Sequence, residues 1–235
     1  MRIIMSLISL MILTGCAVMD LNTMDTAVPI YPDKLAVSSY AGLGVDYSSP
    51  FFRDDYQSNS EEEPEGVGTD AVGAYKVGVA LQEDLDIQGK VYVASSSWGV
   101  KAGVKKLLHQ EGKTYYAIMP MLTHVSGIKE NDDEYGNDDK FKSYGMEVTG
   151  LISRQISQYF TGTIAMRYNL SQYQEHSAEY DGESYLITHG GITANLRLKS
   201  RALFLGVEYG VEILPNPAVE IQLIPTIALG IGFQL

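Results

Sequence analysis

The sequence contains a single cysteine, Cys16, in 235 residues, which excludes an internal disulfide and any disulfide-built scaffold. Basic residues are also scarce: 17 Lys and Arg stand against 29 Asp and Glu, and the formal net charge is -12. A surface that binds phosphate backbones needs a basic excess, so nucleic acid is not an expected partner. With only 23 glycines the chain is not collagen-like, and with 45% hydrophobic residues it is not disordered. A folded protein of one domain is therefore expected.

The N-terminus has the features of an export signal. Arg2 precedes an uncharged apolar stretch at 3–13, and small residues follow it. As a helix this stretch rises only about 16 Å against about 30 Å of bilayer hydrocarbon, so it is too short to span a membrane. Residues 1–15 are therefore predicted to be a secretory signal peptide.

The end of this signal carries a further motif. Leu13-Thr14-Gly15-Cys16 resembles the lipobox of bacterial lipoproteins, in which the cysteine is acylated and becomes the new N-terminus. The residue after the cysteine is Ala17. An Asp at this position would resemble an inner-membrane retention signal, and it is not present here. The resemblance implies lipidation at Cys16 and delivery to the outer membrane of a Gram-negative cell. The simpler alternative is an ordinary signal peptide that contains a cysteine.

Residues 16–34 have no sustained hydrophobic period, and they contain Pro29 and Pro32. This composition is typical of a linker. We interpret 16–34 as a lipidated tether and plug-in segment at the periplasmic rim of the domain formed by 35–235.

From Leu35 onward the apolar residues recur at every second position, which predicts β-strands with one apolar and one polar or small face. In one segment, for example, Leu205 and Val207 share one parity, and Gly206 and Glu208 share the other. Strands about 11–13 residues long are long enough to cross a bilayer when tilted. The pattern predicts ten strands, with eight as the alternative, at about 35–47, 71–83, 85–95, 98–108, 114–126, 143–153, 159–170, 185–199, 202–212 and 218–235.

The connections between these strands differ in length by side. The long connections, at 48–70, 127–142 and 171–184, all fall on the side opposite the start of the first strand. They hold 17 of the 29 acidic residues and only four of the 17 basic ones. Tight periplasmic turns and longer extracellular loops are typical of outer-membrane barrels. We therefore expect acidic extracellular loops, with the C-terminus and the lipid anchor on the periplasmic side.

Sixteen tyrosines, many of them at predicted strand ends, add an expected aromatic girdle. The closing Phe233-Gln234-Leu235 is similar to the C-terminal assembly signal of outer-membrane barrels, although Leu replaces the usual final aromatic residue. Together these features resemble small bacterial outer-membrane β-barrels over residues 35–235. The resemblance implies an all-β fold, an up-and-down antiparallel transmembrane barrel, with outer-membrane lipid and lipopolysaccharide as partners and the monomer as the expected state.

The polar face of the strands carries charged side chains that should point into the lumen. Charges in a narrow lumen must pair or meet water. Two hypotheses stay open, an ion-pair network that plugs the lumen and a narrow porin-like solute channel. The candidates are Lys76, Lys90, Lys101, Lys105, Glu147, Arg167, Arg197, Glu208 and Glu212.

The loop at 131–139 is rich in carboxylates, but it fails as an EF-hand. With Gly136 at the sixth position, Tyr135 and Lys142 occupy the fifth and twelfth positions, where oxygen ligands are required. Weak binding of divalent cations at the acidic loops stays open, and no metal site or cofactor is predicted.

Three functions remain as hypotheses. The first is a non-enzymatic, lipid-anchored barrel with a structural, surface-interaction or narrow solute-passage role. The second is a periplasmic, lipid-tethered barrel that binds a ligand in its cup, which requires a polar outer face and an apolar inner one. The third is an outer-membrane hydrolase similar to the ten-stranded proteases. Its candidate residues are His176 and His189, with Asp138 or Asp181.

Overall fold

The computed structural model describes residues 18–20, 22–30, 34–46, 69–95, 97–129, 139–176, 184–200, 202–216 and 220–234. These residues form eleven β-strands. In chain order the strands are β1 (Val18–Asp20), β2 (Leu35–Asp46), β3 (Thr69–Gln82), β4 (Leu85–Val93), β5 (Ser97–Glu111), β6 (Thr114–Lys129), β7 (Asp139–Gln155), β8 (Phe160–His176), β9 (Ser184–Ser200), β10 (Leu203–Asn216) and β11 (Glu220–Gln234).

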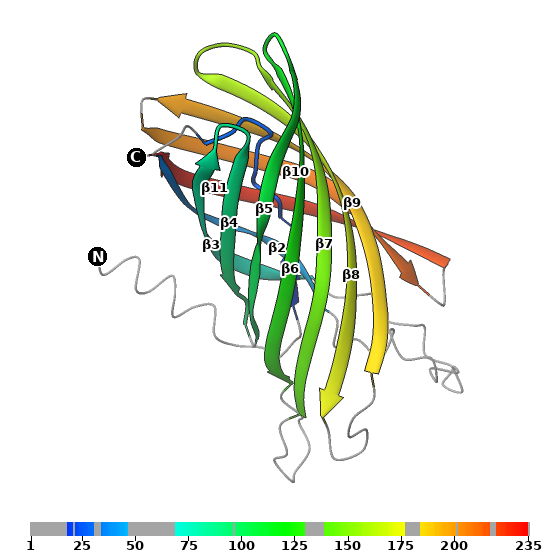
Figure 1. Cartoon of the computed structure of the whole chain (residues 1–235). Helices are drawn as coiled ribbons and strands as arrows, with labels where there is room; N and C mark the ends of the chain where they lie inside the picture. The colour runs from blue at the N-terminus through cyan, green and yellow to red at the C-terminus, as the bar shows by residue number, and fades with distance from the viewer. Residues whose placement is uncertain are drawn as a thin grey trace.

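Strands β2 to β11 form a closed barrel (Figure 1). Each strand pairs antiparallel with the next along the chain, and β11 pairs with β2, so the ring of ten closes on itself. The predicted fold class is confirmed, and the ten predicted strands correspond to β2–β11 within a few residues. Within the part of the chain that the structure describes, no helix is long and apolar enough to cross a membrane.

Alternation of side chains along the strands divides the barrel into two faces. On β10, Leu205 and Val207 are 46% and 42% exposed on the outside, whereas Glu208 between Val207 and Tyr209 is 1% exposed. Successive residues of a strand point to opposite faces, so one parity of the sequence lines the lumen and the other covers the outer wall. The barrel therefore carries its apolar residues outward and most of its charged residues inward.

The two ends of the barrel differ in their connections. At one end the strands are joined by short turns, at 83–84, 112–113, 156–159 and 201–202, and both Leu35 and Gln234 lie at this end. Gly112 has a φ of 56°, a left-handed conformation that glycine adopts without steric cost. We call this the short-turn end. The opposite end, from which the connections 47–68, 130–138 and 177–183 leave, is the loop end.

The barrel closes unevenly at the seam between β2 and β11. Strand β11 pairs with β2 only along Ala228–Gln234, and beyond Gly42 the edge of β2 pairs instead with β1. Pro225 lies on the part of β11 that pairs only with β10 among the described strands. Proline lacks a backbone N–H and is tolerated at such an edge. Strand β1, which the sequence analysis did not predict, thus takes the place of β11 at the loop end of the seam.

Candidate functional site: a lumen filled by the N-terminal segment

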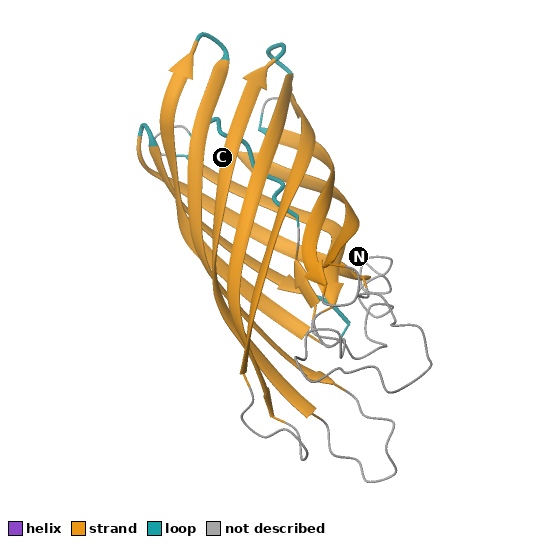
Figure 2. Ribbon diagram, turned by 90° about the vertical axis from the view of Figure 1, so that its right-hand side faces the viewer, coloured by secondary structure: helices purple, strands orange, loops and turns teal. Residues whose placement is uncertain are grey.

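Residues 22–30, which we call the plug segment, run through the inside of the barrel (Figure 2). Before them, Val18 of β1 pairs with Asp46, the last residue of β2, at the loop end. After them, the backbone N–H of Ile30 donates to the carboxylate of Asp86 at 3.2 and 3.3 Å, next to the first short turn. The segment therefore crosses the lumen from the loop end to the short-turn end. All of 22–27 and Ile30 are buried.

A left-handed backbone conformation in the plug segment is held from two neighbouring strands. Met24 has a φ of 42°, which is uncommon for a residue other than glycine. The carboxylate of Glu208 on β10 accepts the N–H groups of Thr23 and Met24 at 2.8 and 2.6 Å. On β9, Arg197 donates to the carbonyl of Met24 at 3.1 Å. One anionic and one cationic side chain of the wall thus fix the backbone at Thr23 and Met24.

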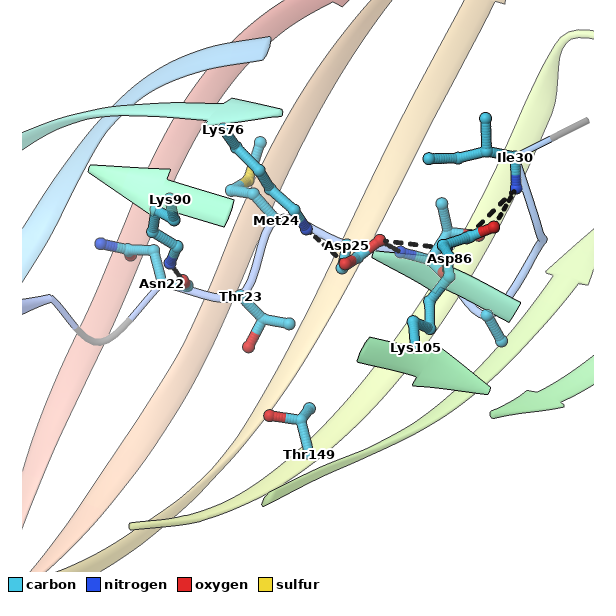
Figure 3. Close-up of polar contacts among 12 residues, drawn as sticks. Asn22, Thr23, Met24, Asp25, Ile30, Lys76, Asp86, Lys90, Lys105 and Thr149 are labelled. Carbon is cyan, nitrogen blue, oxygen red and sulfur yellow. Dashed lines mark hydrogen bonds and ion pairs between the residues drawn. The ribbon is translucent and has the colours of Figure 1, made fainter. Parts of the chain in front are cut away.

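Ion pairs hold Asp25 of the same segment (Figure 3) and Asp20 of the preceding strand β1. Lys76 pairs with Asp25, and Lys90 pairs with Asp20 at 2.6 Å. Lys105 pairs with Asp86 at 2.9 Å and lies 3.7 Å from Asp25. All these side chains are at least nine-tenths buried. Breaking a buried pair by removing one partner costs about 3–5 kcal/mol, so these contacts oppose withdrawal of the segment.

Other lumen charges pair within the wall itself. Lys101 pairs with Glu147 at 2.6 Å, and its ammonium also donates to the carbonyl of Asp20 at 2.9 Å. Glu212 accepts from Arg167 at 2.5 Å and also pairs with His189. These contacts satisfy charges that a narrow lumen would otherwise leave buried without compensation.

Glycines on the lumen face make room for the plug segment. A Cβ at Gly42 would lie 2.5 Å from the Asn22 amide, and one at Gly230 would lie 2.6 Å from Cε of Met24. At Gly78 the nearest atom is Cδ1 of Ile30, at 2.7 Å. Real Cβ contacts are longer than this, so a larger residue at these positions would require the Asn22, Met24 or Ile30 side chain to move.

Apolar side chains complete the filling of the lumen. Ala27 of the plug segment is fully buried against Ala117, Met119, Met121 and Leu151 on β6 and β7. A second cluster lies near the loop end and contains Val72, Leu214 and the stacked rings of Phe141 and Tyr173, whose centroids are 5.7 Å apart. These inward apolar residues explain why the predicted strands 114–126 and 143–153 alternate less cleanly than the others.

The structure places the nine lumen charges of the sequence analysis inside the barrel. Eight are buried, and Arg197 is half-buried. Sequence reasoning missed Asp20, Asp25 and Asp86, which are also buried there. The predicted set contained six bases and only three acids. An excess of three positive charges in a narrow lumen requires counter-charges, and this imbalance is the signal that could have pointed to three further carboxylates.

The position of the N-terminal segment differs from the expected tether at the periplasmic rim. Residues 18–20 and 22–30 are part of the barrel interior and its seam, because wall side chains bind their backbone and carboxylates. Cys16 itself lies outside the described residues. Val18, the first described residue, pairs with Asp46 at the loop end. The anchor was expected at the opposite end, together with the C-terminus.

The hydrolase candidates are not brought together in the described part of the chain. His189 is 2% exposed and bonded to Glu212, so its imidazole is not open to a substrate. Asp138 and Asp181 lie outside the described residues, as does the side chain of His176 and most of the acidic loop at 131–139. Among the residues that the structure describes, no group of three His, Cys, Asp or Glu side chains is placed to hold a metal ion.

Comparisons with known proteins show similarity of fold. No family model matches the chain, and no curated protein sequence matches it. Among solved structures, Ail, the attachment invasion locus protein of Yersinia pestis in complex with sucrose octasulfate, is 14% identical with a TM-score of 0.41, over 86% of this chain and 98% of Ail. The outer-membrane protease OmpT from Escherichia coli is 10% identical with a TM-score of 0.46, over 87% of this chain and 97% of OmpT.

An outer-membrane channel from Pseudomonas putida F1 is also 10% identical, with a TM-score of 0.49 over 92% of this chain and all of that one. These similar proteins are bacterial outer-membrane barrels. At such identities and TM-scores the likeness is one of shape, and no activity passes from these proteins to this chain.

Proposed function

We propose that the protein is an integral barrel of the bacterial outer membrane, closed by its own N-terminal segment, with a structural or surface-interaction role and no catalysis. The observation that carries the proposal is the inverted distribution of polarity. Large apolar side chains on the outer wall of every barrel strand are 36–70% exposed, whereas Lys76, Lys90, Lys101 and Glu147 are buried inside. A soluble protein rarely exposes a continuous apolar surface of this extent.

The height of the apolar wall supports a membrane-spanning position. Trp98, His124 and Tyr144 form an exposed or half-buried ring cluster near the loop end, with centroids 5.5 and 4.6 Å apart. Tyr159 and Phe160 are exposed at the short-turn end. From Tyr144 to the end of β7, strand rise and tilt give about 28 Å along the barrel axis, close to the apolar band of about 25 Å in outer-membrane barrels. Aromatic rings at both limits are typical of the two membrane interfaces.

The same distribution weighs against a periplasmic ligand-binding barrel. That hypothesis requires a polar outer face and an apolar cup, whereas Leu186, Leu223 and Leu229 are 62–70% exposed on the outside. Its cup would also have to be accessible, and here the plug segment fills the lumen.

Heat-modifiable gel mobility of the membrane fraction tests the membrane-integral proposal. We expect the unboiled protein to migrate differently from the boiled protein and to stay in the membrane after carbonate extraction. Release by carbonate together with unchanged mobility would contradict an integral barrel.

The lipid anchor at Cys16 belongs to this proposal. If the long connections are extracellular, Val18, which follows Cys16 by two positions in the sequence, lies at the extracellular rim. A tag near Glu63 or Asp133, and a second tag directly after Ala17, should then both react with antibody on whole cells. Reaction only after permeabilisation would mean that the loop end faces the periplasm.

A narrow solute channel is the second candidate function. The wall charges favour it only when the plug segment is displaced from the lumen. With the plug segment in place, the lumen is filled. Without it and the preceding strand β1, the wall would keep six bases and lose the carboxylates of Asp20 and Asp25, so the open lumen would be cationic. The four remaining buried wall carboxylates are Asp86, Glu147, Glu208 and Glu212. Passage would therefore require displacement of the segment and would favour anions.

A further inference from the structure

A cavity of about 100 Å³ lies at the short-turn mouth of the lumen, next to the plug segment. Its walls come from the starts or ends of barrel strands and from residues 24–30. Four cationic side chains line it, and only one carboxylate does. The cations are Lys76, Lys105, Arg197 and Lys199, and the carboxylate is Asp25.

The two lysines deeper in the lumen have their counter-charges. Lys76 pairs with Asp25, and Lys105 pairs with Asp86 at 2.9 Å and with the carbonyls of Thr26 and Val28 at 3.1 Å. Their positive charge is therefore balanced by neighbouring carboxylates. The other two cations that line this mouth, Arg197 and Lys199, come from β9.

Arg197 is the first of these two cations. None of the ion pairs among the described residues includes it. Its guanidinium donates to the carbonyl of Met24 at 3.1 Å and lies 4.3 Å from the centre of the Phe204 ring. A guanidinium has five N–H donors in a planar fork suited to carboxylate and phosphate oxygens. The ring and the single carbonyl orient this group, and the carboxylates of Asp25 and Glu208 attract it without forming a direct ion pair.

A second cation and neutral donors surround the same space. Lys199 lies two residues further along the same face of β9, and its ammonium donates to the side chain of Gln234 at 2.9 Å. The hydroxyls of Ser38 and Thr161 also line the cavity. The volume corresponds to about three water molecules, enough for one small oxyanion or for the anionic end group of a larger molecule.

We propose that this cavity is a binding site for a phosphate group, held between Arg197 and Lys199 with the Phe204 ring as its apolar side. The phosphate is either a free ion or the headgroup of a phospholipid whose chains lie in the adjacent leaflet. The site goes beyond the proposed structural role, and it depends on the lumen geometry rather than on the membrane in which the barrel resides.

Calorimetric titration of the detergent-purified full chain with sodium phosphate, at ionic strength held constant with sodium chloride, tests the site. We expect saturable binding to one site, weakened at least tenfold in Arg197→Gln and several-fold in Lys199→Gln. Lys106→Gln is the matched control, because Lys106 pairs with Asp84 outside the lumen and both side chains are 43% exposed. This control should bind phosphate as the wild type does.

Heat-modifiable mobility verifies that each variant is folded, and Arg197→Lys, which keeps the charge, should retain part of the affinity. Absence of saturable binding to the wild type, or equal affinity in Arg197→Gln and Lys106→Gln, would overturn the proposal. Repeating the titration in nanodiscs of phosphatidylglycerol separates the two sources. Loss of free-phosphate binding there identifies the headgroup as the occupant, and unchanged binding identifies the free ion.

Discussion

Neutralising Asp25 should destabilise the whole barrel, because this residue of the plug segment holds a lysine of the wall. In Asp25→Asn the ammonium of Lys76, 7% exposed, loses its carboxylate, whereas Lys105 keeps Asp86 at 2.9 Å. A buried charge left without its partner costs about 3–5 kcal/mol. That is a large part of the 5–15 kcal/mol by which domains are usually stable.

The complementary variant Lys76→Met should lower the free energy of unfolding by less than Asp25→Asn does. Asp25 would still lie 3.7 Å from Lys105 and would still accept the N–H of Thr26 at 2.7 Å. The double variant removes both charges. Its loss of unfolding free energy should therefore be clearly smaller than the sum of the losses in the two single variants. We expect a coupling free energy of about 2 kcal/mol or more, in the upper part of the range for residues in contact.

Urea unfolding in liposomes, followed by heat-modifiable mobility, measures these free energies. The exposed pair Lys106–Asp84, 2.5 Å apart, is the control for the same cycle, and surface pairs give at most about 1 kcal/mol. A coupling between Asp25 and Lys76 no larger than that of the control pair would refute the placement of the segment in the lumen.

Three further predictions concern the wall, the anchor and the loops. Val207→Arg places a charge on the outer wall near mid-strand, which should lower the free energy of unfolding by about 2–4 kcal/mol and reduce the folded yield in liposomes. The control Val207→Leu should fold normally. Normal folding of the arginine variant would contradict a lipid-facing wall. Cys16→Ser should abolish acylation and leave an uncleaved precursor, so metabolic lipid label retained on the variant would exclude the lipobox hypothesis. Protease should reach a cleavage site inserted near Asp133 on intact cells, and protection there would reverse the proposed topology.

The barrel itself could be predicted because its signal is local. Alternation such as Leu203, Leu205 and Val207 against Gly206 and Glu208 depends only on the two-residue period of a strand, and the structure follows it. The same two-residue period predicted that four lysines of β3, β4 and β5 point into the lumen, and these four are buried there. Glycines on the polar face, such as Gly42 and Gly230, leave room in the lumen, although their positions do not show what occupies it.

The plug segment could not be predicted in the same way, because its contacts join residues far apart in the chain. Glu208 binds the backbone of Thr23 and Met24, more than 180 positions away, and no period marks residues 22–30. Two prolines and the lack of a hydrophobic pattern are typical of a linker. Asp20 and Asp25 gave no local sign of burial, and only the charge imbalance of the predicted lumen required them.

Conductance across planar bilayers tests the central claim, that the chain closes its own barrel, most directly. The full chain should show no steady conductance, whereas a variant lacking residues 18–30 should conduct and favour anions, since six bases then face four acids in the wall. Equal steady conductance of the two proteins would contradict the account.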